Sequence, residues 1–200
     1  MVSIDLHVHT RLHSPCAETL DPERLPAVLR DAGLQGLVVT EHDALWTEAE
    51  LARAMGGLRR GERIYRGIEV TTRDGHYVVI GLPDAAGLSA GMSPDALVAL
   101  AHRAGAAVIL AHPHRDRVGA FEAVPAGVDA VEVFAAGGDD ARVLALARAR
   151  GLAGVAGSDA HAAEVVGAAF TAFPRLPGDE RELARLVAAG AGLARRRGAW

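Results

Sequence analysis

The chain has 200 residues, 50% of them hydrophobic and 23% charged, which excludes a disordered or fibrous protein, and no apolar run is long enough to span a bilayer. The formal net charge of -4 argues against a general coat for nucleic acid, and the single cysteine, Cys16, excludes an internal disulfide framework and a zinc site made only of cysteines. All the basic residues are arginines, and the absence of lysine excludes Schiff-base lysine chemistry and the lysine of a nucleotide-binding phosphate loop.

Short runs of β-branched and aliphatic residues alternate with helical stretches along the chain. Helices are expected to open at Asp21-Pro22 and at Ser93-Pro94, because a capping side chain followed by proline is typical of a helix start. Asp74-Gly75 predicts the turn of a hairpin-like pair. The expected strands are residues 2–8, 36–40, 63–71, 76–82, 106–111, 128–135, 152–157 and 168–173, and further helices are expected over 44–55, 139–150 and 179–189.

Most of the expected strands are continuous apolar runs rather than alternating ones, which indicates strands covered on both faces and mainly parallel pairing. The pattern predicts an α/β fold and fits either a barrel of about seven strands or an open doubly wound sheet. The arginine run at 195–197 is interpreted as a solvated end. No linker interrupts the series, so we expect one domain over residues 1–200. Because the sequence starts with a strand-like segment instead of a signal peptide, we expect a cytoplasmic location.

The histidines carry the functional signal. All of the nine except His102 fall beside the ends of expected strands or in the loops that follow them. In parallel α/β folds the carboxyl ends of the strands converge on one face, so residues far apart in sequence can meet there.

His7 and His9 flank Val8, and the period of two along a strand places both imidazoles on the same side, as a chelating pair. Asp5 lies on that face too. It is either a carboxylate that orients an imidazole, which we favour, or a buried group satisfied by the backbone.

The second strand ends in polar residues, with His42 as a ligand candidate and Asp43 as a possible helix N-cap. Glu69 lies inside an otherwise apolar strand, where a carboxylate needs a metal or an arginine as its partner. His76 opens the following strand.

Two further motifs follow later strands. His112 and His114 flank Pro113, which fixes the turn, and we assign the weaker, substrate-facing role to His114. Asp159 and His161 then present a carboxylate and an imidazole two residues apart. Histidine nitrogen mixed with carboxylate oxygen suits zinc, manganese or iron, and the candidates supply two ions well and a third only with help from water or substrate.

These residues, in this order, resemble the PHP domain, the polymerase and histidinol phosphatase superfamily. The resemblance runs from residue 2 to about residue 173. It rests on Asp5-x-His7-x-His9-Thr10, Thr40-Glu41-His42-Asp43, Gly67-Ile68-Glu69, His76, His112-Pro113-His114 and Gly157-Ser158-Asp159-Ala160-His161. It implies a distorted seven-stranded β/α barrel.

The resemblance also implies a centre of two or three divalent ions. His7, His9, Glu69 and Asp159 would hold the first ion, and Glu69 would bridge to a second ion held by His76 and His112. His42 and His161 would hold the third. In many family members one more residue shortly after the first motif completes that third site, and His13 and Cys16 are the nearest candidates here. Glu69, Asp159 and His161 are the expected catalytic residues.

The mechanism expected from such a centre is phosphoester hydrolysis by a metal-bound hydroxide. Arginine grips phosphate with two parallel hydrogen bonds, so Arg11 and Arg115, together with His114, are the candidate substrate ligands. The expected partner is a small phosphomonoester, resembling histidinol phosphate or a nucleotide, or the end of a short oligonucleotide. No membrane and no obligate protein partner are indicated.

Two alternatives stay open. An amidohydrolase-type metal hydrolase also begins with a His-x-His strand, but that class usually uses a carboxylated lysine or a glutamate bridge, and only Glu69 could serve here. A non-catalytic PHP module that binds a partner would have lost ligands, whereas nearly all are present.

Overall fold

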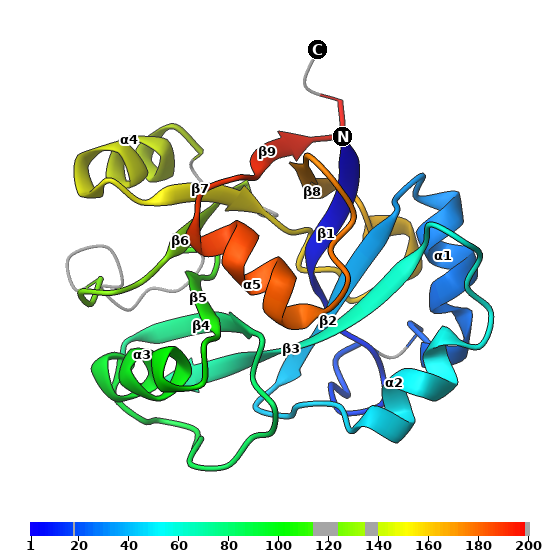
Figure 1. Cartoon of the computed structure of the whole chain (residues 1–200), viewed down its shortest axis with the longest axis horizontal. Helices are drawn as coiled ribbons and strands as arrows, with labels where there is room; N and C mark the ends of the chain where they lie inside the picture. The colour runs from blue at the N-terminus through cyan, green and yellow to red at the C-terminus, as the bar shows by residue number, and fades with distance from the viewer. Residues whose placement is uncertain (18, 114–123, 135–139, 199–200) are drawn as a thin grey trace.

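The computed structural model describes residues 1–17, 19–113, 124–134 and 140–198. Within them, one sheet of nine strands runs through the molecule in the order β7-β6-β5-β4-β3-β2-β1-β8-β9 (Figure 1). The strands are β1 Val2–Val8, β2 Gly36–His42, β3 Arg63–Thr72, β4 Gly75–Ile80, β5 Ala107–Leu110, β6 Ala130–Phe134, β7 Ala153–Ala156, β8 Ala169–Phe173 and β9 Leu193–Arg196.

The expectation of mainly parallel pairing is wrong. Four of the strand pairs are parallel, and the other four, β1 with β8, β3 with β4, β4 with β5 and β8 with β9, are antiparallel. The tight turn between β3 and β4 permits only an antiparallel pair. A continuous apolar run therefore reports that both faces of a strand are buried, and not the direction of its neighbour.

The sheet curls into a nearly closed barrel with nine strands, where seven were expected. Beyond the end of β7 the chain returns to β1, where Ala160 forms a parallel bridge with Val8 and its carbonyl accepts from His9 N at 2.9 Å. The arginine run, interpreted from the sequence as a solvated end, is exposed, and Arg195 and Arg196 belong to β9, which pairs with β8.

In Figure 1 the helix Glu180–Ala188 (α5) lies in the middle of the view, and the other α-helices lie around the sheet. Asp21 caps the first turn and Ser93 caps α3, both as predicted. The second helix starts later than expected, because Thr47 and Glu50 form a capping box. The elements are η1 Pro22–Arg24, α1 Leu25–Asp31, α2 Glu48–Met55, α3 Pro94–Arg103, α4 Asp140–Arg150, η2 Ala163–Val165 and α5 Glu180–Ala188. In the described part of the chain, no helix has both the length and the apolar character that crossing a membrane requires.

A bulge in β1 directs the first site residues. Asp5 pairs with Leu37 and Val8 pairs with Val39, so β1 has one more residue than β2 between these two pairs. The extra residue shifts the alternation of side chains along β1 by one position. Ile4 and Leu6 pack with Leu183 of α5 in one core cluster, whereas Val8 packs in a different cluster.

Candidate metal centre

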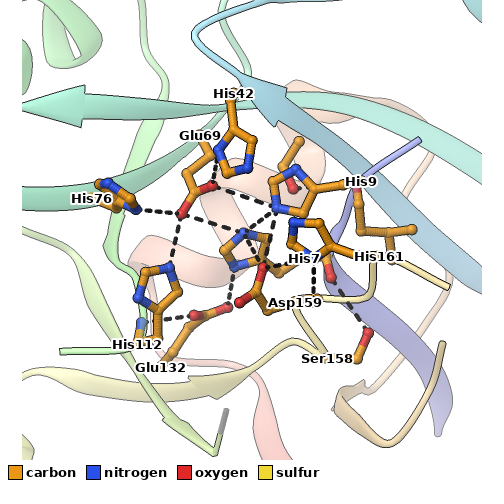
Figure 2. A network of polar contacts seen from close by, with 12 residues as sticks. His7, His9, His42, Glu69, His76, His112, Glu132, Ser158, Asp159 and His161 are labelled. Atoms are coloured by element: carbon orange, nitrogen blue, oxygen red, sulfur yellow. Dashed lines mark hydrogen bonds and ion pairs between the residues drawn. The ribbon is translucent and has the colours of Figure 1, made fainter. Parts of the chain in front are cut away.

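All eight predicted metal ligands meet at one end of the sheet, as Figure 2 shows. Each comes from a strand or from the segment that follows it. The chain returns to this end at β4, because β4 is antiparallel to β3 and so starts where β3 finishes. The cluster comprises His7 of β1, His9 just after β1, His42 of β2, Glu69 of β3, His76 of β4, His112 after β5, and Asp159 and His161 after β7.

Glu69 is the hub of this cluster. Its Oε1 lies 2.8 Å from His112 Nε2 and 3.2 Å from His76 Nδ1. Its Oε2 lies 2.8 Å from His42 Nδ1 and 3.4 Å from His9 Nε2. The two oxygens of one fully buried carboxylate therefore face different imidazoles, as a bridging ligand requires.

Asp159 is the second carboxylate. Its Oδ1 lies 3.2 Å from His9 Nε2, 3.5 Å from His7 Nε2 and 3.7 Å from His161 Nδ1. His7 Nε2 and His9 Nε2 are themselves 3.1 Å apart. Ring nitrogens at the end of β1 and carboxylate oxygens of two other segments thus converge on one point.

Four sets of three ligand atoms each lie within 4.8 Å of one another in the described residues. Nitrogen and oxygen donors in this mixture suit zinc, manganese or iron, and the residues present therefore fit divalent metal ions. The sets are His7, His9 and Glu69; Glu69, His76 and His112; His7, His112 and Asp159; and His9, His42 and His161.

The burial of the cluster is graded. His7, His9 and Glu69 are fully buried and form its floor. His42, His76 and His161 have side chains that are 35%, 28% and 28% exposed. A substrate can therefore reach the cluster from the side of these three rings.

The electrostatics favour a cation. Burial lowers the pKa of His9 to about 2, and the neighbouring histidines act in the same direction, so the ring is neutral, as a metal ligand must be. Burial opposes a charge on His7, but the carboxylates of Glu132 and Glu69 outweigh it and raise its pKa to about 10. Burial opposes the charge on Glu69 too, yet His7 and the hydrogen bonds from the rings hold the pKa of that carboxyl well below its ordinary value.

Two backbone features allow this packing. Gly157 leaves the space that the site needs, because a Cβ atom there would lie 2.5 Å from His7 Cβ and 2.7 Å from His7 N. His112 and Asp159 have positive φ values of 22° and 52°, which side chains other than glycine rarely adopt.

The other candidates of the sequence belong to none of the four sets or lie outside the described residues. Arg11 is exposed and forms an ion pair with Asp21 at 2.5 Å. His13 Nε2 lies 3.0 Å from Glu50 Oε1, and Cys16 is exposed. Two candidate substrate ligands, His114 and Arg115, lie outside the described residues.

Two interpretations of polar residues need correction. Asp5 does not orient an imidazole. Its carboxylate accepts from Ser158 N and Oγ at 2.8 and 2.6 Å, from Gly167 N at 2.8 Å and from His7 N at 3.2 Å. Asp43 does not cap a helix either, because its Oδ1 accepts from Thr71 N at 2.8 Å.

The sequence interpretation missed Glu132 and Ser14. Glu132 of β6 is buried, and its Oε1 lies 3.0 Å from His7 Nδ1. It carries the same signal as Glu69, a carboxylate between apolar strand residues. Ser14 Oγ lies 3.3 Å from His9 Nδ1 and accepts from His42 N at 3.1 Å, and no sequence pattern distinguishes this serine from a loop residue.

Among solved structures, the similar ones share the fold over nearly the whole chain. PsfC from Pseudomonas syringae PB-5123 is 25% identical with a TM-score of 0.64, and the match covers 97% of this chain and 88% of that one. A two-domain protein from Bacteroides vulgatus ATCC 8482, containing a predicted PHP-like metal-dependent phosphoesterase, is 16% identical with a TM-score of 0.69, covering 98% and 64%. An amidohydrolase from Chromobacterium violaceum, with bound sulfate and no metal, is 19% identical with a TM-score of 0.65, covering 96% and 97%.

Family comparison gives a match at the C-terminal part of the chain. The family described as PHP-associated matches residues 139–191, which include β7 and both ligands that follow it. No curated protein matches the chain. The matched segment, the shared fold and the order of the ligand motifs support the resemblance to the PHP domain superfamily.

Proposed function

We propose that this protein is a metal-dependent phosphoesterase. Its substrate would be a phosphomonoester, resembling histidinol phosphate or a nucleotide, or the end of a short oligonucleotide. The observation that carries the proposal is the convergence of six imidazoles and two carboxylates, with Glu69 between the sets of ligand atoms. A fold relative described as containing a PHP-like metal-dependent phosphoesterase supports the same class of reaction.

The ring nitrogens set how many ions this chain can hold tightly. His7 Nδ1 faces Glu132 and His9 Nδ1 faces Ser14, so each of these two rings offers Nε2 to a metal. With Glu69 and Asp159 these nitrogens would hold one ion.

A second ion would lie between Glu69, His76 and His112. His42 and His161 then supply two rings for a third ion, because His9 Nε2 already serves the first. We therefore propose two tightly held ions and a third held more weakly, with zinc, manganese or iron as the candidates.

When bound, such ions would lower the pKa of a water molecule towards about 7 and offset the negative charge of a phosphoryl group. The chain's own residues set where this happens. Glu69 and Asp159 bring negative charge to the floor of the site, which concentrates cations there. The partly exposed ring of His161 lies beside Asp159 at the open side, where the substrate would enter.

The phosphate-binding role of Arg11 remains a proposal alongside that of His114 and Arg115. Arg11 would have to exchange its ion pair with Asp21 for the phosphate. An exposed ion pair contributes little stability, so such an exchange is inexpensive. Arg11→Ala should raise KM for an aryl phosphate with kcat retained, and an unchanged KM would remove Arg11 from the site.

The test of the proposed function combines metal content with turnover. Purified protein is analysed for metals, stripped with a chelator and resupplied with zinc or manganese, and p-nitrophenyl phosphate and bis-p-nitrophenyl phosphate are assayed at each stage. We expect about two tightly held ions per chain and turnover that returns with the metal. A metal-loaded protein that hydrolyses neither ester would contradict the proposal.

Hydrolysis of an amide is the second candidate, favoured by the fold relative described as an amidohydrolase. Amide hydrolysis would require the same metal ions and would break a C–N bond in place of a P–O bond. The metal-loaded protein should be offered a panel of N-acyl amino acids beside the esters. Turnover of an amide with no turnover of either ester would replace the first proposal by the second.

A further inference from the structure

Glu132 contacts two ligands of the cluster, yet in the described residues it belongs to none of the four converging sets. It lies on β6, with 2% of its surface exposed. A buried carboxylate is costly unless it is paired and hydrogen-bonded, so its partners indicate its role.

The first partner is the ring of His7. Glu132 Oε1 lies 3.0 Å from His7 Nδ1, and Figure 2 shows the carboxylate on the side of the ring that faces away from Glu69. A carboxylate accepts and does not donate, so Nδ1 must carry the proton of this hydrogen bond. When the ring is neutral, as metal binding requires, its lone pair is on Nε2, which points to His9 and Asp159.

The second partner is the backbone of His112. Its N–H donates to Glu132 Oε2 at 2.9 Å, at a residue whose φ of 22° is unfavourable for a side chain with a Cβ atom. The bond helps to hold the turn after β5 in this conformation. The ring on that turn places Nε2 2.8 Å from Glu69 Oε1.

Gly157 makes the contact with His7 possible. A Cβ atom at that position would lie 2.8 Å from Glu132 Oε1, in addition to its clash with His7. The loop after β7 can therefore close over the pair only because residue 157 has no side chain.

We propose that Glu132 is a positioning residue that fixes the Nδ1–H tautomer of His7 and holds the turn that carries His112. One carboxylate thereby aligns ligands of two proposed ions. The inference rests on the metal-binding part of the proposed function, and its measurements require no ester.

The first experiment is Glu132→Gln, studied with zinc alone. No orientation of the amide satisfies both partners while His7 keeps its proton on Nδ1. If the amide oxygen accepts from His112 N–H, the NH₂ group donates to His7 Nδ1, and the neutral ring must then carry its proton on Nε2. In the reverse orientation the NH₂ group faces the N–H of His112, and two donors oppose each other. We expect zinc affinity to fall about 10- to 100-fold, the range for such supporting residues.

Asp129→Asn is a matched control. Asp129 Oδ2 also accepts from a backbone N–H, that of Val108 at 2.8 Å, and also contacts an imidazole, that of His102 at 3.1 Å. These partners lie outside the cluster. We expect zinc affinity to be unchanged in this variant. Equal zinc affinity in wild type, Glu132→Gln and Asp129→Asn would overturn the proposal, even where both variants melt at lower temperature in chelator.

The tautomer itself is measured in the wild-type protein, which keeps the test decisive if Glu132→Gln does not fold. In zinc-loaded protein labelled with ¹⁵N on histidine, His7 should show a protonated Nδ1 and a metal-bound Nε2. Binding through Nδ1 would overturn the proposal. Because neither measurement uses turnover, an inactive protein with these properties would contradict the phosphoesterase and leave the role of Glu132 standing.

Discussion

Replacing Glu69 with glutamine tests the bridging role most directly. The substitution keeps the size of a fully buried side chain, and it removes the negative charge that lies within 3.6 Å of five imidazoles. The ligand atoms of its two sets lie within 4.8 Å of one another. At a separation of about 4 Å and an effective dielectric constant of about 20, one pair of unit charges is worth about 4 kcal/mol.

We therefore expect Glu69→Gln to weaken metal binding about a thousandfold, since about 1.4 kcal/mol corresponds to a factor of ten. Zinc affinity is measured against a competing chelator, and circular dichroism in excess chelator checks the fold, which should be retained. Turnover of p-nitrophenyl phosphate should be lost.

Glu41→Gln is the control for this experiment. Glu41 is an equally buried carboxylate that accepts from Thr10 N at 3.1 Å and from Trp46 Nε1 at 2.9 Å. Its neutralisation should lower stability and leave zinc affinity unchanged. Wild-type affinity in Glu69→Gln, or an equal loss in Glu41→Gln, would refute the bridging role and indicate only the general field of buried carboxylates.

Three further outcomes are expected. Gly157→Ala should lower the melting temperature and the metal content together, because its Cβ would lie 2.5 Å from His7 Cβ, and overpacking of this kind costs about 1–3 kcal/mol; normal values of both would show that the loop relaxes freely. His13→Ala should keep all the metal found in the wild type by elemental analysis, since His13 contacts Glu50, and a loss of one ion would assign His13 to the third site. Chelation should lower the melting temperature, because a metal ion present at 1,000 times its Kd adds about 4 kcal/mol to the free energy of unfolding. An unchanged melting temperature would favour a module without metals.

The cluster could be predicted from the sequence because most of the ligands stand at an abrupt change between apolar and polar residues. His42 ends β2, and His7 and His9 surround the end of β1. Glu69 gave a different signal, a charge inside an apolar strand. The wrong expectation for strand direction did not affect the prediction of the site. The antiparallel β4 starts at the end of the sheet where β3 finishes, and His76 therefore lies beside the other ligands.

The remaining features depend on contacts that no local pattern contains. The strand Leu193–Arg196 has no apolar run and is defined by its pairing with β8. Glu132 has the same apolar neighbours as Glu69, but no motif beside it indicates which ligands it would meet. Asp5 accepts from Ser158 and Gly167, which are more than 150 residues away, so its role follows from the curl of the sheet.

Among the residues that the structure describes, backbone strain is confined to the site. In the described part of the chain, the non-glycine residues with positive φ are Asp43, His112 and Asp159, and each follows a strand that carries the cluster or is itself a ligand. Such conformations cost about 1–3 kcal/mol and persist only where the surroundings hold them. Asp43 N donates to Glu69 O at 2.8 Å, and His112 N donates to Glu132. Protein hydrogen bonds therefore hold these turns, and the ligand geometry is organised by the fold before any ion binds.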